Sequence, residues 1–316
     1  MEYQDIAAMA KRVKENVAKV IIGRADQLDL ILAAIIARGH VLLEDVPGTG
    51  KTVMARSLAK SLGCAFSRVQ FTPDLLPADI TGMSVYQPGS GAFEFMPGPV
   101  FTNILLADEI NRATPRTQAA LLECMEERQV TEGGVSRQME TPFLVLATQN
   151  PVETQGTFPL PEAQLDRFLI RLSMGYPDEE EALRLMERFL RSSPLETLEP
   201  VASKEEIGQA QALFCQCAVA APVMEYIARL CQATRDRDRV QLGASPRGML
   251  ALLRAAQALA ATRGRDYVVP DDVKLLAVPV LAHRIILRGL YGRREESEQF
   301  VREILEKIPA PTEEAP

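Results

Sequence analysis

The sequence predicts an α/β protein, in which a parallel sheet flanked by helices is followed by a smaller all-helical domain. Between about residues 41 and 175, short apolar runs of strand length alternate with helical runs, which is typical of a buried parallel sheet. From 178 to about 308 the pattern is helical nearly throughout. We therefore expect a core domain over 1–175, a helical lid-like domain over 178–308 and a flexible tail over 309–316.

Two helices are expected ahead of the sheet. Apolar residues at helical spacing from Ile6 to Val17 predict the first, and a break at 22–24 separates it from a second over 26–38. Strands are expected at 41–43, 65–71, 104–107, 144–148 and 168–172. Gly175-Tyr176-Pro177 is the candidate linker to the helical domain, whose helices should break near 192–200, 243–246 and 268–270.

The segment from Asp45 to Thr52 connects the first predicted strand to a helix and has the composition of a phosphate-binding loop. Glycines let backbone N–H groups approach phosphates, and the helix N-terminus adds partial positive charge. Lys51 would reach the β- and γ-phosphates of a nucleotide, and the Thr52 hydroxyl would hold Mg²⁺. Asp45 stands where this loop usually begins with glycine. The predicted nucleotide-binding residues here are Pro47, Gly48, Thr49, Gly50, Lys51, Thr52 and Val53.

Two further strands end in polar side chains. The strand over 104–107 ends in Asp108 and Glu109, and that over 144–148 leads to Asn150. The carboxyl ends of parallel strands lie beside the phosphate site in such sheets. We expect Asp108 to bind Mg²⁺ with Thr52, and Glu109 to take a proton from the attacking water. Asn150 would contact that water or the γ-phosphate, although an Asn before a proline is also common turn chemistry.

The composition narrows the class of protein. The net charge of −7 makes a large nucleic-acid footprint unexpected. No stretch resembles a secretory signal, and the apolar runs are too short to span a membrane. The five cysteines lack metal-binding spacing, which favours free thiols in a reducing compartment. The expected location is therefore the cytoplasm.

Several strings in this order resemble those of AAA+ ATPases. The phosphate loop and the two polar strand ends are followed by Leu165-Asp166-Arg167-Phe168 and by 243–247, Gly-Ala-Ser-Pro-Arg. The strings 43–48, 108–113, 121–127, 147–151 and 156–164 are similar to those of the MoxR family in particular. The resemblance covers nearly the whole chain. It implies an AAA+ core with a helical lid, bound ATP and Mg²⁺, and a homo-oligomeric ring, expected to be a hexamer.

The resemblance also implies a role for each matching residue. Lys51 and Thr52 match the Walker A motif, Asp108 and Glu109 the Walker B motif, and Asn150 sensor 1. Arg167 matches the arginine finger that acts on a neighbouring subunit's nucleotide, with Arg171 as the alternative, and Arg247 matches sensor 2 on the lid. Guanidinium groups at the γ-phosphate stabilise the charge that develops during transfer. Ile22 and Gly23 resemble the segment that packs on adenine.

Two predicted inserts distinguish the chain within these ATPases. One spans 80–101, and the other is a hairpin over 127–137 with Gly133-Gly134 as its turn. In related rings such elements face the pore or the client, and the alternative is two surface hairpins without a client.

Three functions fit the motifs to different degrees. The first is a ring ATPase that remodels a protein partner or assists metal or cofactor insertion, with a von Willebrand factor A-type client implied by resemblance. The second is a nucleic-acid motor related to ring helicases, against which the net charge argues. The third is a simple phosphate-loop enzyme. A GTPase should contain a guanine-binding Asn-Lys-x-Asp box, which this sequence lacks, and a small-molecule kinase would not need Arg167 and Arg247.

Overall fold

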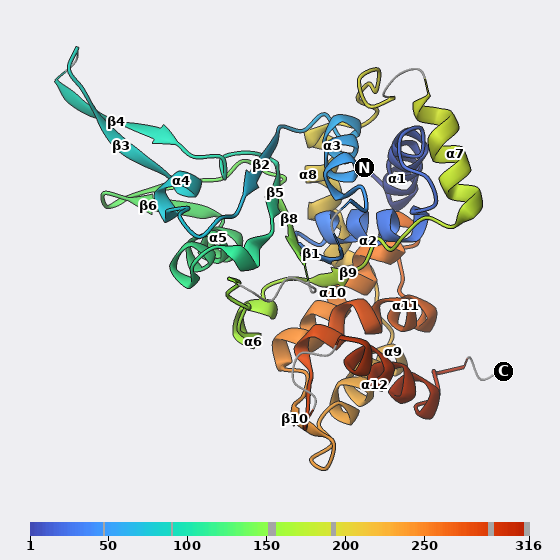
Figure 1. The fold of residues 1–316 in the computed structure, drawn as a ribbon. Coiled ribbons are helices and arrows are strands. Elements are labelled where there is room, and N and C mark those ends of the chain that lie inside the picture. Colours follow the sequence, from blue (N-terminus) through green and yellow to red (C-terminus); the bar gives the residue numbers. More distant parts are fainter. Residues whose placement is uncertain (47, 90, 151–155, 191–193, 290–293, 313–316) are drawn as a thin grey trace.

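The computed structural model describes residues 1–46, 48–89, 91–150, 156–190, 194–289 and 294–312 (Figure 1). Pro47 of the predicted phosphate loop and the last four residues of the predicted tail lie outside the described residues. Within the described parts of the chain, none of the helices has the length and apolarity that crossing a bilayer requires.

A parallel five-stranded sheet forms the centre of the first domain, as the sequence predicted. Two helices, α1 (Tyr3–Val17) and α2 (Ala25–Ile36), precede it. Its spatial order is β2-β5-β8-β1-β9, with β1 (Val41–Glu44), β2 (Phe66–Gln70), β5 (Ile104–Asp108), β8 (Leu144–Gln149) and β9 (Ile170–Leu172). Because β8 lies between β1 and β5, the residues that follow these three strands meet at one edge of the sheet.

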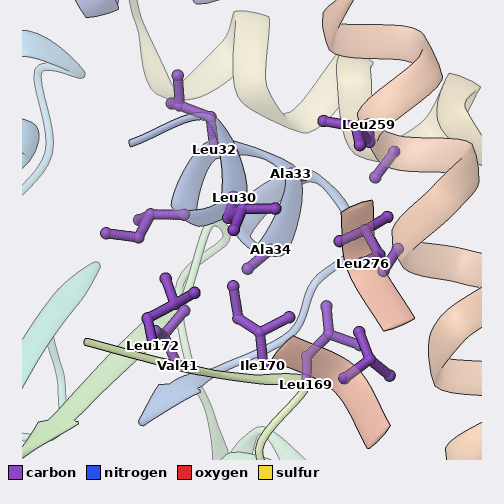
Figure 2. Close-up of a cluster of buried hydrophobic side chains, with 14 of the residues drawn as sticks. Leu30, Leu32, Ala33, Ala34, Val41, Leu169, Ile170, Leu172, Leu259 and Leu276 are labelled. Atoms are coloured by element: carbon purple, nitrogen blue, oxygen red, sulfur yellow. The ribbon is translucent and has the colours of Figure 1, made fainter. Parts of the chain in front are cut away.

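Successive strand residues point to opposite faces of the sheet, and each face has its own core. Val41 and Leu43 join the cluster under α1, α2 and α3 (Lys51–Ser61), whereas Leu42 packs on the other face with α5 (Pro115–Glu127). Figure 2 shows the first cluster, in which side chains of α2 lie between the strands and Leu259 and Leu276 of the C-terminal helices. The sheet core is therefore continuous with the helical part.

The helical part contains α7 (Glu179–Phe189), α8 (Lys204–Leu213), α9 (Ala221–Ala233), α10 (Pro246–Thr262), α11 (Pro270–Leu281) and α12 (Arg294–Lys307). Short strands β10 (Val240–Leu242) and β11 (Ile286–Leu287) pair within it, and 3₁₀ turns cover Phe214–Gln216 and Ala282–Arg284. The first of these helices, α7, lies beside α1 in Figure 1, where Arg188 donates to the carbonyl of Ala18. The segment after the predicted linker is thus attached to the N-terminal helices.

Both predicted inserts are hairpins. The first, after the short α4 (Pro77–Thr81), is formed by β3 (Gly82–Gln87) and β4 (Ala92–Pro97), and it projects from the sheet in Figure 1. The second is formed by β6 (Gln129–Glu132) and β7 (Val135–Gln138), with Gly133 and Gly134 in the left-handed region. The Ser84 hydroxyl donates to Glu132 at 2.7 Å, so the turn end of the second hairpin contacts the base of the first.

Candidate functional site

The phosphate loop folds as the glycines predict. Gly48 and Gly50 have φ of +85° and +84°, and an added Cβ at either would meet nothing within 4 Å, so the loop leaves open space. Gly50 is the N-cap residue of α3, which begins at Lys51. Lys51 Nζ donates to the main-chain carbonyls of Asp45 at 3.0 Å and Val46 at 3.2 Å. The ammonium group therefore lies over the loop, with its charge balanced by carbonyl dipoles.

Asp108 ends β5 and Glu109 follows it at the same edge of the sheet, and Thr148 of β8 hydrogen-bonds to both. The Thr148 hydroxyl donates to Asp108 Oδ1 at 2.6 Å and accepts from the Glu109 N–H at 2.8 Å. Glu109 has a left-handed backbone with φ of +56°, which is uncommon outside glycine and is often found at functional sites. Asp108 Oδ2 accepts from Arg68 Nη2 of β2 at 2.6 Å.

The Glu109 carboxylate is held by two donors. Its Oε2 accepts from Gln70 Nε2 at 2.7 Å and from Arg112 Nη1 at 3.0 Å; Arg112 belongs to the 3₁₀ turn Ile110–Arg112. Sequence reasoning missed Gln70, Arg68 and Thr148. The available signal was their position in the last three residues of β2 and β8, the strands on either side of β5.

These residues share one cavity of about 420 Å³. Its lining includes Gly48, Gly50, Lys51, Thr52, Asp108, Glu109 and Asn150, so the structure brings together the residues predicted for phosphate, metal and water. Among the described residues, no cluster of three or more His, Cys, Asp or Glu side chains is placed to bind a metal. A hydroxyl and one carboxylate instead fit Mg²⁺, which usually completes its shell with water and phosphate oxygens.

A second, apolar cavity of about 470 Å³ adjoins the first, and Gly48, Gly50 and Val53 line both. Its other walls come from the segment before α2, the linker and α7, and include Val20, Ile21, Ile22, Met174, Pro177, Leu185, Met186 and Phe189. Predicted Ile22 lies in this wall. Gly23 lies against Glu181, which pairs with Arg24 at 3.0 Å. An apolar cavity beside a phosphate loop has the chemistry of a nucleobase site.

Arg167 and Arg247 come together, but not at this site. Arg167 Nη2 lies 3.1 Å from Glu126 Oε2, and Arg247 Nη2 lies 2.7 Å from Glu126 Oε1. Both arginines line a third cavity of about 480 Å³ with Arg38 and His40, which precede β1, whereas Lys51 follows β1. The two arginines are thus at the opposite end of the sheet from the phosphate loop of their own chain. Glu126, which joins them, was missed although it lies in the 121–127 string.

Arg171, the alternative finger, has a different environment. It lies in β9 with its side chain 11% exposed, and its Nη1 is 3.4 Å from Glu44 Oε2. Burial lowers the pKa of its guanidinium, and Glu44 counteracts this effect. Arg171 is therefore an interior residue that pairs within its own chain.

Comparisons with known proteins agree with this geometry. The model of the ATPase family associated with various cellular activities (AAA) matches residues 40–170, and that of the AAA lid domain matches 232–308. The chain is 50% identical to the uncharacterized protein YeaC of Bacillus subtilis, over 99% of this chain and 98% of that one. It is 42% identical to the chaperone MoxR1 of Mycobacterium tuberculosis, over 86% of this chain and 74% of the relative.

Among solved structures, a putative ATPase from Cytophaga hutchinsonii superimposes with a TM-score of 0.89 at 39% identity, covering 98% of this chain and 97% of that one. The fold and the order of the motifs are therefore shared along almost the whole chain. The chain belongs to the MoxR family of AAA+ ATPases.

Proposed function

We propose that this protein hydrolyses ATP with Mg²⁺ in a homo-oligomeric ring and uses the cycle to remodel or mature a protein partner. Lys51 would hold the β- and γ-phosphates, and Thr52 and Asp108 would hold Mg²⁺, which neutralises phosphate charge when bound. Arg68 pairs with Asp108 at 2.6 Å, so this guanidinium would compete with the metal for the carboxylate. Glu109 would take the proton of the attacking water, and Asn150 would orient that water.

The position of Arg167 and Arg247 is the observation that best supports a ring. Both lie at the far end of the sheet from Lys51, and one carboxylate, Glu126, holds them side by side. A charge-stabilising arginine has to reach the γ-phosphate. In a ring, the arginine end of one subunit faces the phosphate loop of the next, so both guanidinium groups would act on a neighbour's nucleotide. A hexamer is the closed ring we propose.

The proposed client is a protein. The β3–β4 hairpin exposes large apolar side chains, with Phe93 73% exposed, and residues 82–97 contain no lysine or arginine. This composition suits an apolar protein surface, whereas a phosphate backbone requires basic groups. A von Willebrand factor A-type partner, assistance to metal or cofactor insertion and a cytoplasmic location are parts of the same proposal. A nucleic-acid motor, the alternative, would need a basic surface on this hairpin.

A mixing experiment tests the ring. Lys51→Ala and Arg167→Ala proteins should each have little ATPase activity alone, whereas a mixture of exchanging subunits should regain activity. Each mutant supplies what the other lacks at a shared interface. Glu109→Gln should keep ATP binding and lose turnover, because an amide cannot accept the proton. A mixture no faster than the sum of its parts, or light scattering that shows only monomer with ATP, would contradict the ring.

A further inference from the structure

Asp45 begins the phosphate loop, and its main-chain N–H and carbonyl both form hydrogen bonds within β1, β8 and that loop. The position is one that glycine usually occupies, yet here it carries a carboxylate that is 7% exposed. The Asp45 N–H donates to the carbonyl of Gln149 at 3.2 Å, which continues the pairing of β1 with β8. Its own carbonyl accepts from Lys51 Nζ at 3.0 Å. The backbone of this residue therefore belongs to the phosphate subsite.

The side chain of Asp45 points to a different segment. Its Oδ1 accepts from Ser173 Oγ at 2.7 Å and from the Gly175 N–H at 3.3 Å, and its Oδ2 accepts from the Met174 N–H. Three consecutive residues thus donate to one carboxylate, and two of the donors are backbone groups. A glycine at position 45 would leave the buried Met174 N–H and the half-buried Ser173 and Gly175 donors without this partner, which is costly.

The segment that Asp45 holds is a wall of the apolar cavity. Met174 and Pro177 line that cavity, and the chain then enters α7, which supplies Leu185 and Met186 to it. From the other side, Arg24 Nη2 donates to the Gly175 carbonyl at 3.3 Å. Hydrogen bonds therefore hold this wall from two sides, and those to Asp45 connect it to the phosphate loop.

We propose that Asp45 is a positioning residue for the nucleotide, because it fixes the wall of the nucleoside cavity to the loop that binds the triphosphate. The inference rests on the proposed ATP-binding function and adds a residue to it. Lys51 reaches the carbonyl of Asp45, and the linker reaches its carboxylate, so a movement of the loop on phosphate binding is passed to residues 173–177. The base and triphosphate subsites then act as one site.

The test separates the two subsites by ligand. Asp45→Asn keeps the size of the side chain but weakens its acceptance from backbone N–H groups, and Asp238→Asn makes the same change on an exposed loop. Affinities for ATP and for inorganic tripolyphosphate are measured by calorimetry. We expect Asp45→Asn to weaken ATP binding about tenfold, while tripolyphosphate affinity changes less than twofold. Hydrogen exchange at the amides of Met174 and Gly175 should become faster in the same variant.

Equal losses for ATP and tripolyphosphate would overturn the proposal, because Asp45 would then act through the phosphate loop alone. Unchanged affinity for both ligands would overturn it as well. Ser173→Ala removes one donor and keeps the carboxylate, so it should give about a threefold loss for ATP only and covers the case in which Asp45→Asn does not fold. Wild-type protein that binds neither ligand would instead contradict the proposed ATPase function, so the two failures are distinguishable.

Discussion

Replacing Gly23 by alanine would disturb the wall of the apolar cavity where an N-terminal segment meets α7. Gly23 has φ of +70°, and an added Cβ would lie 1.5 Å from Glu181 Oε1, so the Glu181 side chain has to leave. Glu181 then loses its ion pair with Arg24, a contact of 3.0 Å between side chains that are 13% and 11% exposed. We expect the cavity to open, because Glu181 belongs to the helix that supplies Leu185 and Met186.

The loss of unfolding free energy expected for Gly23→Ala is the sum of two terms. A left-handed backbone costs an alanine about 1–2 kcal/mol, and the loss of a charged hydrogen bond at a largely buried site costs about 1.5–3 kcal/mol. Gly133→Ala is the matched control, because Gly133 also has positive φ, at +59°, but nothing lies within 4 Å of its added Cβ. The difference between the two variants isolates the collision with Glu181.

Urea denaturation and ATP calorimetry measure the two effects. Gly23→Ala should lose about 1.5–3 kcal/mol more unfolding free energy than Gly133→Ala. It should also weaken ATP binding by about tenfold or more, whereas Gly133→Ala should leave the ATP affinity unchanged. If both variants lost the same stability and bound ATP equally well, the contact of Gly23 with Glu181 would carry neither stability nor the shape of the cavity.

Three further outcomes are expected. Burial lowers the pKa of His40 from 6.5 to about 4. The unfolding free energy should therefore be constant above pH 6.5 and should fall by about 3 kcal/mol as the pH is lowered toward 4, because the buried ring resists protonation. Burial also lowers the pKa of His283, so neither histidine should titrate between pH 8 and 6 in NMR spectra. Asp272→Asn, at a fully buried carboxylate paired with two arginines, should cost about 3 kcal/mol of unfolding free energy, against less than about 1 kcal/mol for Asp271→Asn in an exposed pair. Cys215, which is exposed, should react with a thiol reagent first and the half-buried Cys64 more slowly, and rapid labelling of Cys124, Cys217 or Cys231 in folded protein would contradict their buried positions.

Much of the fold could be predicted from the sequence because its signals are local. Apolar runs of strand length fixed the five strands to within two residues of their observed ends, and Gly133-Gly134 correctly marked a hairpin turn. The residues around Lys51 were also predictable, since each follows a strand of the same parallel sheet. These predictions need only the chain order and the rule that parallel strands end at one edge.

The remaining contacts depend on packing between segments far apart in the chain. Nothing local to Arg167 or Arg247 indicates that one carboxylate, Glu126, joins them, because α5 and α10 meet only in the folded protein. Likewise, Asp45 looked like a variation of the loop until the structure placed Ser173 beside it. Whether the first domain ends at 175, as predicted, stays a prediction, although α7 does contact the N-terminal helices.

The pairing of Arg167 and Arg247 with Glu126 has an electrostatic consequence for assembly. Two guanidinium groups and one carboxylate leave this cluster with one excess positive charge, and the same cavity is lined by Arg38, Arg254 and the ion pair of Arg284 with Asp166. The opposite end would gain negative charge on binding a nucleoside triphosphate, because Mg²⁺ offsets only part of the phosphate charge. Attraction between the two ends would then grow with nucleotide occupancy and weaken as salt screens it over about 8–10 Å. In the proposed ring, bound ATP would then first act as a counter-ion that stabilises the contact between subunits, and only afterwards be hydrolysed.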